Sequence, residues 1–261
     1  MARSPVFPPG YALWLGSRLP GEIEETSADC NNCAMVKPEG LTRDPGPFLA
    51  HLKCCTYFPF VPNFGLGGML ASPDGGVNRA VRLRLDALKG RGVLLPLGLF
   101  PSPETEQAYK KAGDKAFGRR DDLLCPFFDK ATHGCSVWQN RPGVCTTYFC
   151  KSDRGFSGLE FWQDVESYLN LFEWALANEV VARMGFTEDD LEVSEAVFLE
   201  EEAADRSVLA QGAWGSWAGR EDEFFLECAR RAKEVTPEEV AALMGEDGEA
   251  LEESLRERLR G

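Results

Sequence analysis

The sequence predicts an irregular α+β protein, in which a loop-rich, cysteine-bearing half with a small hairpin precedes a helical half. Three observations predict this fold class. Proline and glycine recur every few positions through residue 75, which argues against long regular elements there. Eight of the nine cysteines lie at or before Cys150, and apolar residues beyond residue 155 recur at helical spacing. We therefore expect a cysteine-cluster metal-binding region over 1–154 and an acidic helical region over 155–261.

Charge follows the same division. Of the net charge of −14, residues 1–154 contribute +4 and residues 155–261 contribute −18. Nucleic-acid binding is not expected, because a general binder needs a net positive face. No apolar run of about 18 residues occurs, so no membrane partner is expected. The first residues lack an apolar segment of signal-peptide length, and we expect a cytoplasmic protein whose thiols stay reduced.

Two local patterns in the first half predict elements. Apolar positions at helical spacing predict a helix over 77–89, ended by Gly90. The glycine cluster over 65–68 is interpreted as a turn next to the double cysteine, because no helix signature begins there.

Residues 123–150 read as short strands and turns. The apolar runs Leu123–Phe128 and Ser136–Trp138 flank a turn over 129–134, the pattern of a small hairpin. Pro142 and Gly143 then break the chain before the last two cysteines of the cluster.

The second half shows helical patterns. Ser157 and Glu160 resemble a capping box at the start of a long helix that ends near Gly185. Its apolar stripe, interpreted as core, comprises Phe161, Val165, Tyr168, Leu169, Phe172, Leu176 and Val180. Thr236 with Pro237 is typical of a helix start. Further helices are expected over 190–203, 221–234 and 248–260.

The chemistry is expected in the cysteines. A pair with two residues between it can converge on one metal ion from a tight turn, and the other thiols also lie in loop or hairpin context near glycine or proline. Buried structural cysteines are instead expected within apolar periodic elements, as for Cys228 beside Phe224 and Phe225. The predicted metal ligands are Cys30, Cys33, Cys54, Cys55, Cys125, Cys135, Cys145 and Cys150.

Other interpretations of these cysteines are weaker. Disulfides are disfavoured by the expected reducing compartment and by the modest cysteine density. A catalytic cysteine paired with His51 or His133 is conceivable from their proximity in sequence, but one nucleophile does not explain eight cysteines. Each histidine is interpreted as a solvent-facing turn residue before a ligand. Arg141, Lys53 or Lys151 would offset thiolate charge, and Arg141 is favoured to donate hydrogen bonds to loop carbonyls.

The cysteine segments in their order along the chain resemble the YkgJ-type cysteine-cluster proteins. This is a family of zinc- or iron-chelating proteins of the CxxCxxCC class, to which flagellin lysine methylases are similar. The segments that carry the resemblance are Leu124–Phe128, Gly134–Trp138, Arg141–Cys145 and Tyr148–Cys150. The resemblance covers about residues 28–152. It departs upstream, where residues 34–53 separate Cys33 from Cys54 and the compact family pattern has two residues.

Two functions from different classes follow. In the first, the chain binds zinc or an iron–sulfur cluster through eight cysteines and supports redox, metal-handling or methyl-transfer chemistry, the last suggested by the resemblance alone. In the second, the metal is structural zinc and the acidic helical half docks a protein partner. Whether the chain is an enzyme is left open, because no nucleophile–base signature, carboxylate pair or phosphate loop is visible.

Overall fold

The structure is a computed structural model that describes residues 3–4, 7–16, 18, 23–24, 33, 35–36, 48–89, 93–113, 116–149, 152–199 and 203–260. The predicted α+β class with a helical second half is confirmed, and every strand among the described residues is two residues long. The helices are α1 (Ala12–Leu15), α2 (Asn63–Leu70), α3 (Gly75–Leu88), α4 (Pro103–Ala112), α5 (Gly143–Thr147), α6 (Gly155–Arg183), α7 (Glu188–Leu199), α8 (Ala203–Gly212), α9 (Glu221–Ala232) and α10 (Pro237–Arg260).

The strands that the structure describes pair in short antiparallel ladders. They are β1 (Arg3–Ser4), β2 (Ile23–Glu24), β3 (Val61–Pro62), β4 (Leu94–Leu95), β5 (Gly98–Leu99), β6 (Phe128–Asp129) and β7 (Gly134–Cys135). β1 pairs with β2, β5 lies between β3 and β4, and β6 pairs with β7. The β6–β7 pair confirms the predicted hairpin, although its strands take up both ends of the expected turn.

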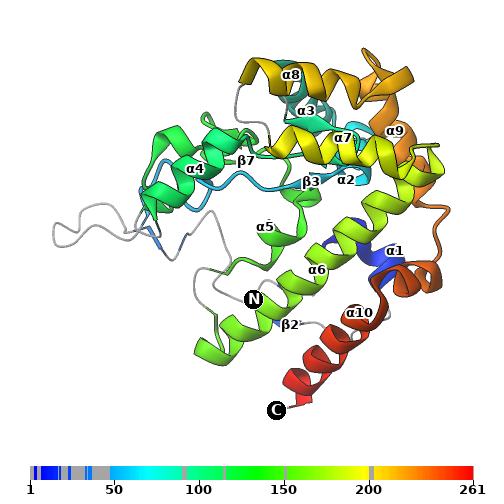
Figure 1. The fold of residues 1–261 in the computed structure, drawn as a ribbon. Coiled ribbons are helices and arrows are strands. Elements are labelled where there is room, and N and C mark those ends of the chain that lie inside the picture. The colour runs from blue at the N-terminus through cyan, green and yellow to red at the C-terminus, as the bar shows by residue number, and fades with distance from the viewer. Residues whose placement is uncertain are drawn as a thin grey trace.

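Helix α6, which has 29 residues, runs diagonally between α5 and α10 in the view of Figure 1 and packs against both. All seven residues of its predicted apolar stripe are fully buried, which confirms them as core. Helix α10 consists of two segments joined at Gly245, where the backbone leaves helical geometry. Its start is a capping box, since the N–H of Thr236 donates to Glu239 Oε2 over 2.7 Å and the N–H of Glu239 donates to Thr236 Oγ1 over 3.2 Å.

One hydrophobic core joins both halves of the chain. It extends from Phe7 near the N-terminus to Leu255 in α10. Helix α2 of the cysteine-rich half packs on α9 of the acidic half, and α5 packs on α6. The cysteine-bearing loops therefore rest on a scaffold to which both halves contribute. Among the described helices, none combines the length and apolarity needed to cross a bilayer.

Helix α2 corrects the predicted turn over 65–68. Three of its eight residues are glycine, and that composition disfavours an isolated helix. Packing decides otherwise, because Gly67 lets the backbone of α2 approach α9 more closely than any side chain would allow. Asn63 fixes the start of α2, with its side-chain amide donating to the carbonyls of Pro96 and Ala177, both at 3.1 Å.

Two further expectations are wrong. The segment after Arg141 and Pro142 forms the short helix α5, although its β-branched residues favour extended structure. Helix α6 begins at Gly155, before the expected capping box, and Ser157 Oγ donates to the carbonyl of Arg154 over 3.0 Å. Helices α4 and α8 were not anticipated.

Candidate functional site

The double cysteine lies in a loop next to the segment that leads into the hairpin. A turn over 51–54 delivers Cys54 and Cys55, and Lys53 within it has the left-handed φ of 55°. The N–H of Cys125 donates to the carbonyl of Cys55 over 2.9 Å. This bond joins two segments 70 residues apart in the chain, so the upstream double cysteine and the first downstream cysteine come together.

The hairpin brings the next thiol to the same place. Cys135 in β7 is the register partner of Phe128 in β6. Cys125 and Cys135 are both partly buried and pack against the hydrophobic core. Lys53 Nζ donates to the carbonyl of His133 over 2.7 Å, which ties the loop of the double cysteine to the tip of the hairpin.

Helix α5 supplies Cys145. The threonines at its end bond back into it: Thr146 Oγ1 donates to the carbonyl of Pro142 over 3.2 Å and Thr147 Oγ1 donates to that of Gly143 over 3.0 Å. These bonds satisfy the hydroxyls of two buried threonines. Cys145 thus comes from a third segment, between the hairpin and α6.

Electrostatics show that these thiols influence one another. Burial raises the pKa of the Cys145 thiol well above its ordinary value, and the thiols of Cys125, Cys135 and Cys54 raise it further. Burial is also the largest cause at Cys125, whose pKa rises to about 12, and at Cys135, whose pKa is raised. Cys125, Cys135 and Cys145 are thus desolvated, and the Cys54 thiol raises the pKa of each. We call these four thiols and that of Cys55 the cysteine cluster.

Cys54 differs from the others. A hydrogen bond from the Cys55 thiol lowers the pKa of Cys54 against the effect of burial, and Arg141 and Lys53 act in the same direction. The same bond raises the pKa of Cys55. Cys54 is therefore the thiol of the cluster that most readily becomes a thiolate, the form that binds metals and attacks electrophiles.

Arg141 is a cation that acts on several thiols of the cluster. Its guanidinium carbon lies 3.4 Å from the ring centroid of Trp138, a stacked cation–π arrangement that holds the charge in place. It lowers the pKa of Cys54, Cys135 and Cys145. Two roles were predicted for Arg141, namely hydrogen bonding to loop carbonyls and offsetting thiolate charge. Its effect on the pKa of three thiols supports the second role.

The remaining predicted residues are placed as follows. Cys33 is a partly buried free thiol in a turn, where its carbonyl accepts from the N–H of Val36 over 3.1 Å. Cys30, Cys150 and Lys151 lie outside the described residues. His51 Nε2 lies 3.3 Å from Asp121 Oδ1 at the surface, and His133 is exposed. Cys228 in α9 is fully buried, which confirms it as a small core residue.

The thiols of the cluster are gathered without being arranged as ligands around one point. Within the part of the chain that the structure describes, no three Cys, His, Asp or Glu side chains converge as a ready metal site. The donor set itself fits a soft metal, since it supplies at least four thiols and a neighbouring cation. Metal binding would need the thiols to lose protons and turn toward one another.

Sequence reasoning missed two residues beside α5. Glu173 in α6 is 1% exposed, and its Oε1 accepts from the hydroxyl of Tyr11 and from the N–H of Gly143. The signal was present in the sequence. Glu173 lies four residues after Leu169 and three before Leu176, so helical spacing places its carboxyl on the buried stripe.

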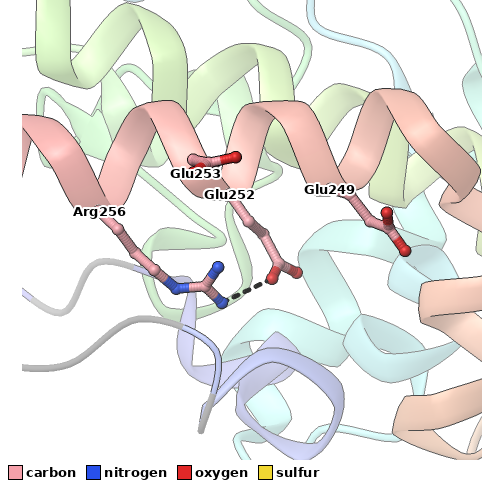
Figure 2. A pocket seen from close by; sticks show the side chains of 4 residues that line it. All are labelled: Glu249, Glu252, Glu253 and Arg256. Atoms are coloured by element: carbon pink, nitrogen blue, oxygen red, sulfur yellow. Dashed lines mark hydrogen bonds and ion pairs between the residues drawn. The ribbon is translucent and has the colours of Figure 1, made fainter.

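A surface groove lies along α10 (Figure 2), with a volume of about 410 Å³. Glu249, Glu252, Glu253 and Arg256 line it. Glu252 accepts from the hydroxyl of Tyr168 over 2.7 Å and from Arg18 over 2.9 Å, and its other oxygen accepts from Arg256 over 2.8 Å. These bonds satisfy the carboxylate, so this acid–base network stabilises the docking of α10 on α6.

Comparisons of the chain with family models, with curated proteins and with solved structures found no match. The resemblance to the cysteine-cluster family therefore stays a prediction.

Proposed function

We propose that the chain binds a metal through its cysteine cluster, as zinc or as an iron–sulfur cluster. One observation carries the proposal: Cys54, Cys125, Cys135 and Cys145 come from three separate segments, and the Cys54 thiol raises the pKa of each of the other three, which are desolvated by burial. Four thiols are the number that a tetrahedral zinc site or a four-iron cluster takes. Cys55 is a fifth candidate, and a second site would need Cys30, Cys33 and Cys150.

Charge supports the same proposal. Four thiolates around Zn²⁺ leave a net charge of about −2, which is costly in a desolvated place unless cations lie nearby. Arg141 is fixed on Trp138 beside the thiols, and Lys53 lies in the turn that carries Cys54. We place the protein in the cytoplasm, where a reducing environment keeps these thiols available to metal.

The role of the bound metal has two candidates. The raised pKa and burial of Cys145 favour a closed, structural zinc site. With such a site the protein would act as an interaction module whose acidic half docks a protein partner. The lowered pKa of Cys54 beside Arg141 favours a reactive thiol, as redox, metal-handling or methyl-transfer chemistry would require. Alkylation of the metal-loaded protein separates the two, because a closed site protects every thiol of the cluster and a reactive site leaves one open.

Metal analysis of anaerobically purified protein tests the proposal. Brown protein containing iron and sulfide indicates an iron–sulfur cluster, and colourless protein containing zinc indicates a zinc site. Each of the substitutions Cys54→Ser, Cys125→Ser, Cys135→Ser and Cys145→Ser is expected to lose metal, whereas Cys228→Ala keeps it. Wild-type protein free of metal after reconstitution, or full metal content in two or more of these four cysteine variants, would show the proposal to be wrong.

A further inference from the structure

The end of α5 that faces α6 is held by a buried carboxyl. Glu173 Oε1 lies 2.5 Å from the hydroxyl oxygen of Tyr11 and 2.7 Å from the backbone nitrogen of Gly143. Tyr11 is buried against the rings of Phe64 and Phe172, so its hydroxyl is fixed by packing. The carboxyl thus bridges the N-terminal 3₁₀ turn (Pro9–Tyr11) and the first residue of α5.

Helix α5 depends on this contact for its position. It has five residues and no side-chain cap at its start, and a helix of that length does not form alone. Gly143 lies so close to α6 that a β-carbon on it would be 2.7 Å from Leu169 Cβ and 3.3 Å from Glu173 Oε1. The Glu173 bond is the polar part of this tight contact, and Cys145 follows two residues later.

We propose that Glu173, oriented by Tyr11, is a positioning residue that fixes α5 so that the Cys145 thiol faces the other cysteines. The inference rests on the proposed metal-binding function and adds two residues to its site. Because Glu173 Oε1 accepts both bonds in a buried place, it fixes the Gly143 N–H relative to α6. Such outer residues orient the groups that touch the metal, and their loss typically weakens metal binding about 10- to 100-fold.

The structure provides a matched control at the other side of α6. Tyr168 is also fully buried, and its hydroxyl also donates to a buried glutamate, Glu252 of α10, over 2.7 Å. Tyr11→Phe and Tyr168→Phe each remove one buried tyrosine–glutamate hydrogen bond. We expect similar losses of stability from the two substitutions, and only Tyr11→Phe acts on the contact with α5.

Cobalt is the probe, because thiolate-to-cobalt charge-transfer absorption counts the thiolates bound to Co²⁺. The experiment titrates anaerobic, metal-free full-length protein with Co²⁺ and compares wild type with Tyr11→Phe, Tyr168→Phe, Glu173→Ala and Glu173→Gln. A second measurement on the metal-free proteins is the rate at which Cys145 is alkylated, followed by peptide mass spectrometry.

Tyr11→Phe and Glu173→Ala are expected to bind Co²⁺ at least about tenfold more weakly, with one thiolate fewer and faster alkylation of Cys145. Glu173→Gln keeps an acceptor for the Gly143 N–H and is expected to restore most of the affinity. Tyr168→Phe is expected to match wild type. The inference is overturned if Tyr11→Phe and Tyr168→Phe behave alike while wild type binds cobalt through thiolates. If wild type shows no thiolate absorption, the proposed function itself is wrong and the inference falls with it.

Discussion

A β-carbon on Gly67 of α2 would lie 1.8 Å from the carbonyl oxygen of Phe225 in α9 and 2.7 Å from Ala229 Cβ. The two helices therefore touch backbone to backbone at this point. The contact joins the cysteine-rich half to the acidic half, at a place where only glycine fits.

Gly67→Ala should destabilise the protein severely, by about 3 kcal/mol or more, because α2 and α9 would have to separate. Gly68→Ala is the control, since a β-carbon there meets nothing within 4 Å and alanine favours the helix. We expect that control to gain roughly 0.5 kcal/mol. Urea denaturation of both variants measures the difference, and equal midpoints would contradict the close contact.

His133→Gly tests whether this histidine is a turn residue or a metal ligand. His133 has a φ of 50°, a conformation that glycine adopts without strain. The bond from Lys53 goes to its backbone carbonyl and survives the substitution. We expect full metal content and an unfolding free energy that is unchanged or up to about 1 kcal/mol higher. Loss of a metal equivalent would instead make His133 a ligand.

Glu173→Gln should change how stability depends on pH. Burial raises the pKa of Glu173 to about 7 from an ordinary 4.5, so the folded protein holds this proton more tightly than the unfolded chain. The stability that this group contributes is therefore greatest at acid pH and is lost as the pH rises through 7. Relative to wild type, the variant should gain roughly 2–3 kcal/mol between pH 5 and pH 8.

Urea denaturation at several pH values measures this trend, and Glu252→Gln gives the opposite control. Hydrogen bonds from Tyr168 and Arg18 overcome burial and lower the pKa of Glu252. Its contribution to stability is present at neutral pH and is lost on acidification, so this variant should lose most relative to wild type at neutral pH. Parallel pH curves for wild type and Glu173→Gln would contradict the raised pKa of Glu173.

Cys228→Ala separates core packing from metal binding. Cys228 is fully buried in α9, and its truncation should cost about 1 kcal/mol by loss of packing. Metal content should be unchanged, because the Cys228 thiol lies within the hydrophobic core. Metal analysis with thermal denaturation measures both, and a lost metal equivalent would place a ligand in the acidic half.

Removal of metal should lower the thermal midpoint of the whole molecule in one transition. Metal that binds only the folded state adds to its stability, and a common core transmits this to both halves. Circular dichroism reports the helices and tryptophan fluorescence reports the core. Two separate transitions after chelation would show that the halves unfold independently.

Local patterns in the sequence predicted those helices whose formation depends on nearby residues. The stripe of α6 and the Thr236 start of α10 were found because apolar spacing and capping are local signals. Helix α2 was missed because its glycines serve a contact with α9, more than 150 residues away. Helix α4 does carry local signals in its sequence, since Ser102 caps it and Pro103 opens it.

In the candidate site too, residue type was informative and contacts between distant residues were not predictable. Residue type alone indicated Cys54, Cys125, Cys135 and Cys145, and the structure brings these thiols together. The hydrogen bond that positions α5 could not be predicted from local sequence, because its donor, Gly143, and its acceptor, Glu173, are 30 residues apart. Nothing local marks Tyr11 as the third member, because packing of the N-terminal turn on α6 brings it there.

Because both halves contribute to one hydrophobic core, neither half can be exchanged by recombination on its own. A break at residue 154 would part α5 from α6 and α2 from α9, and would leave fully buried residues such as Phe172 and Phe225 facing water. The cysteine segment is therefore no exchangeable cassette. A recombinant that carried it into another protein would need the matching surfaces of α6 and α9 as well.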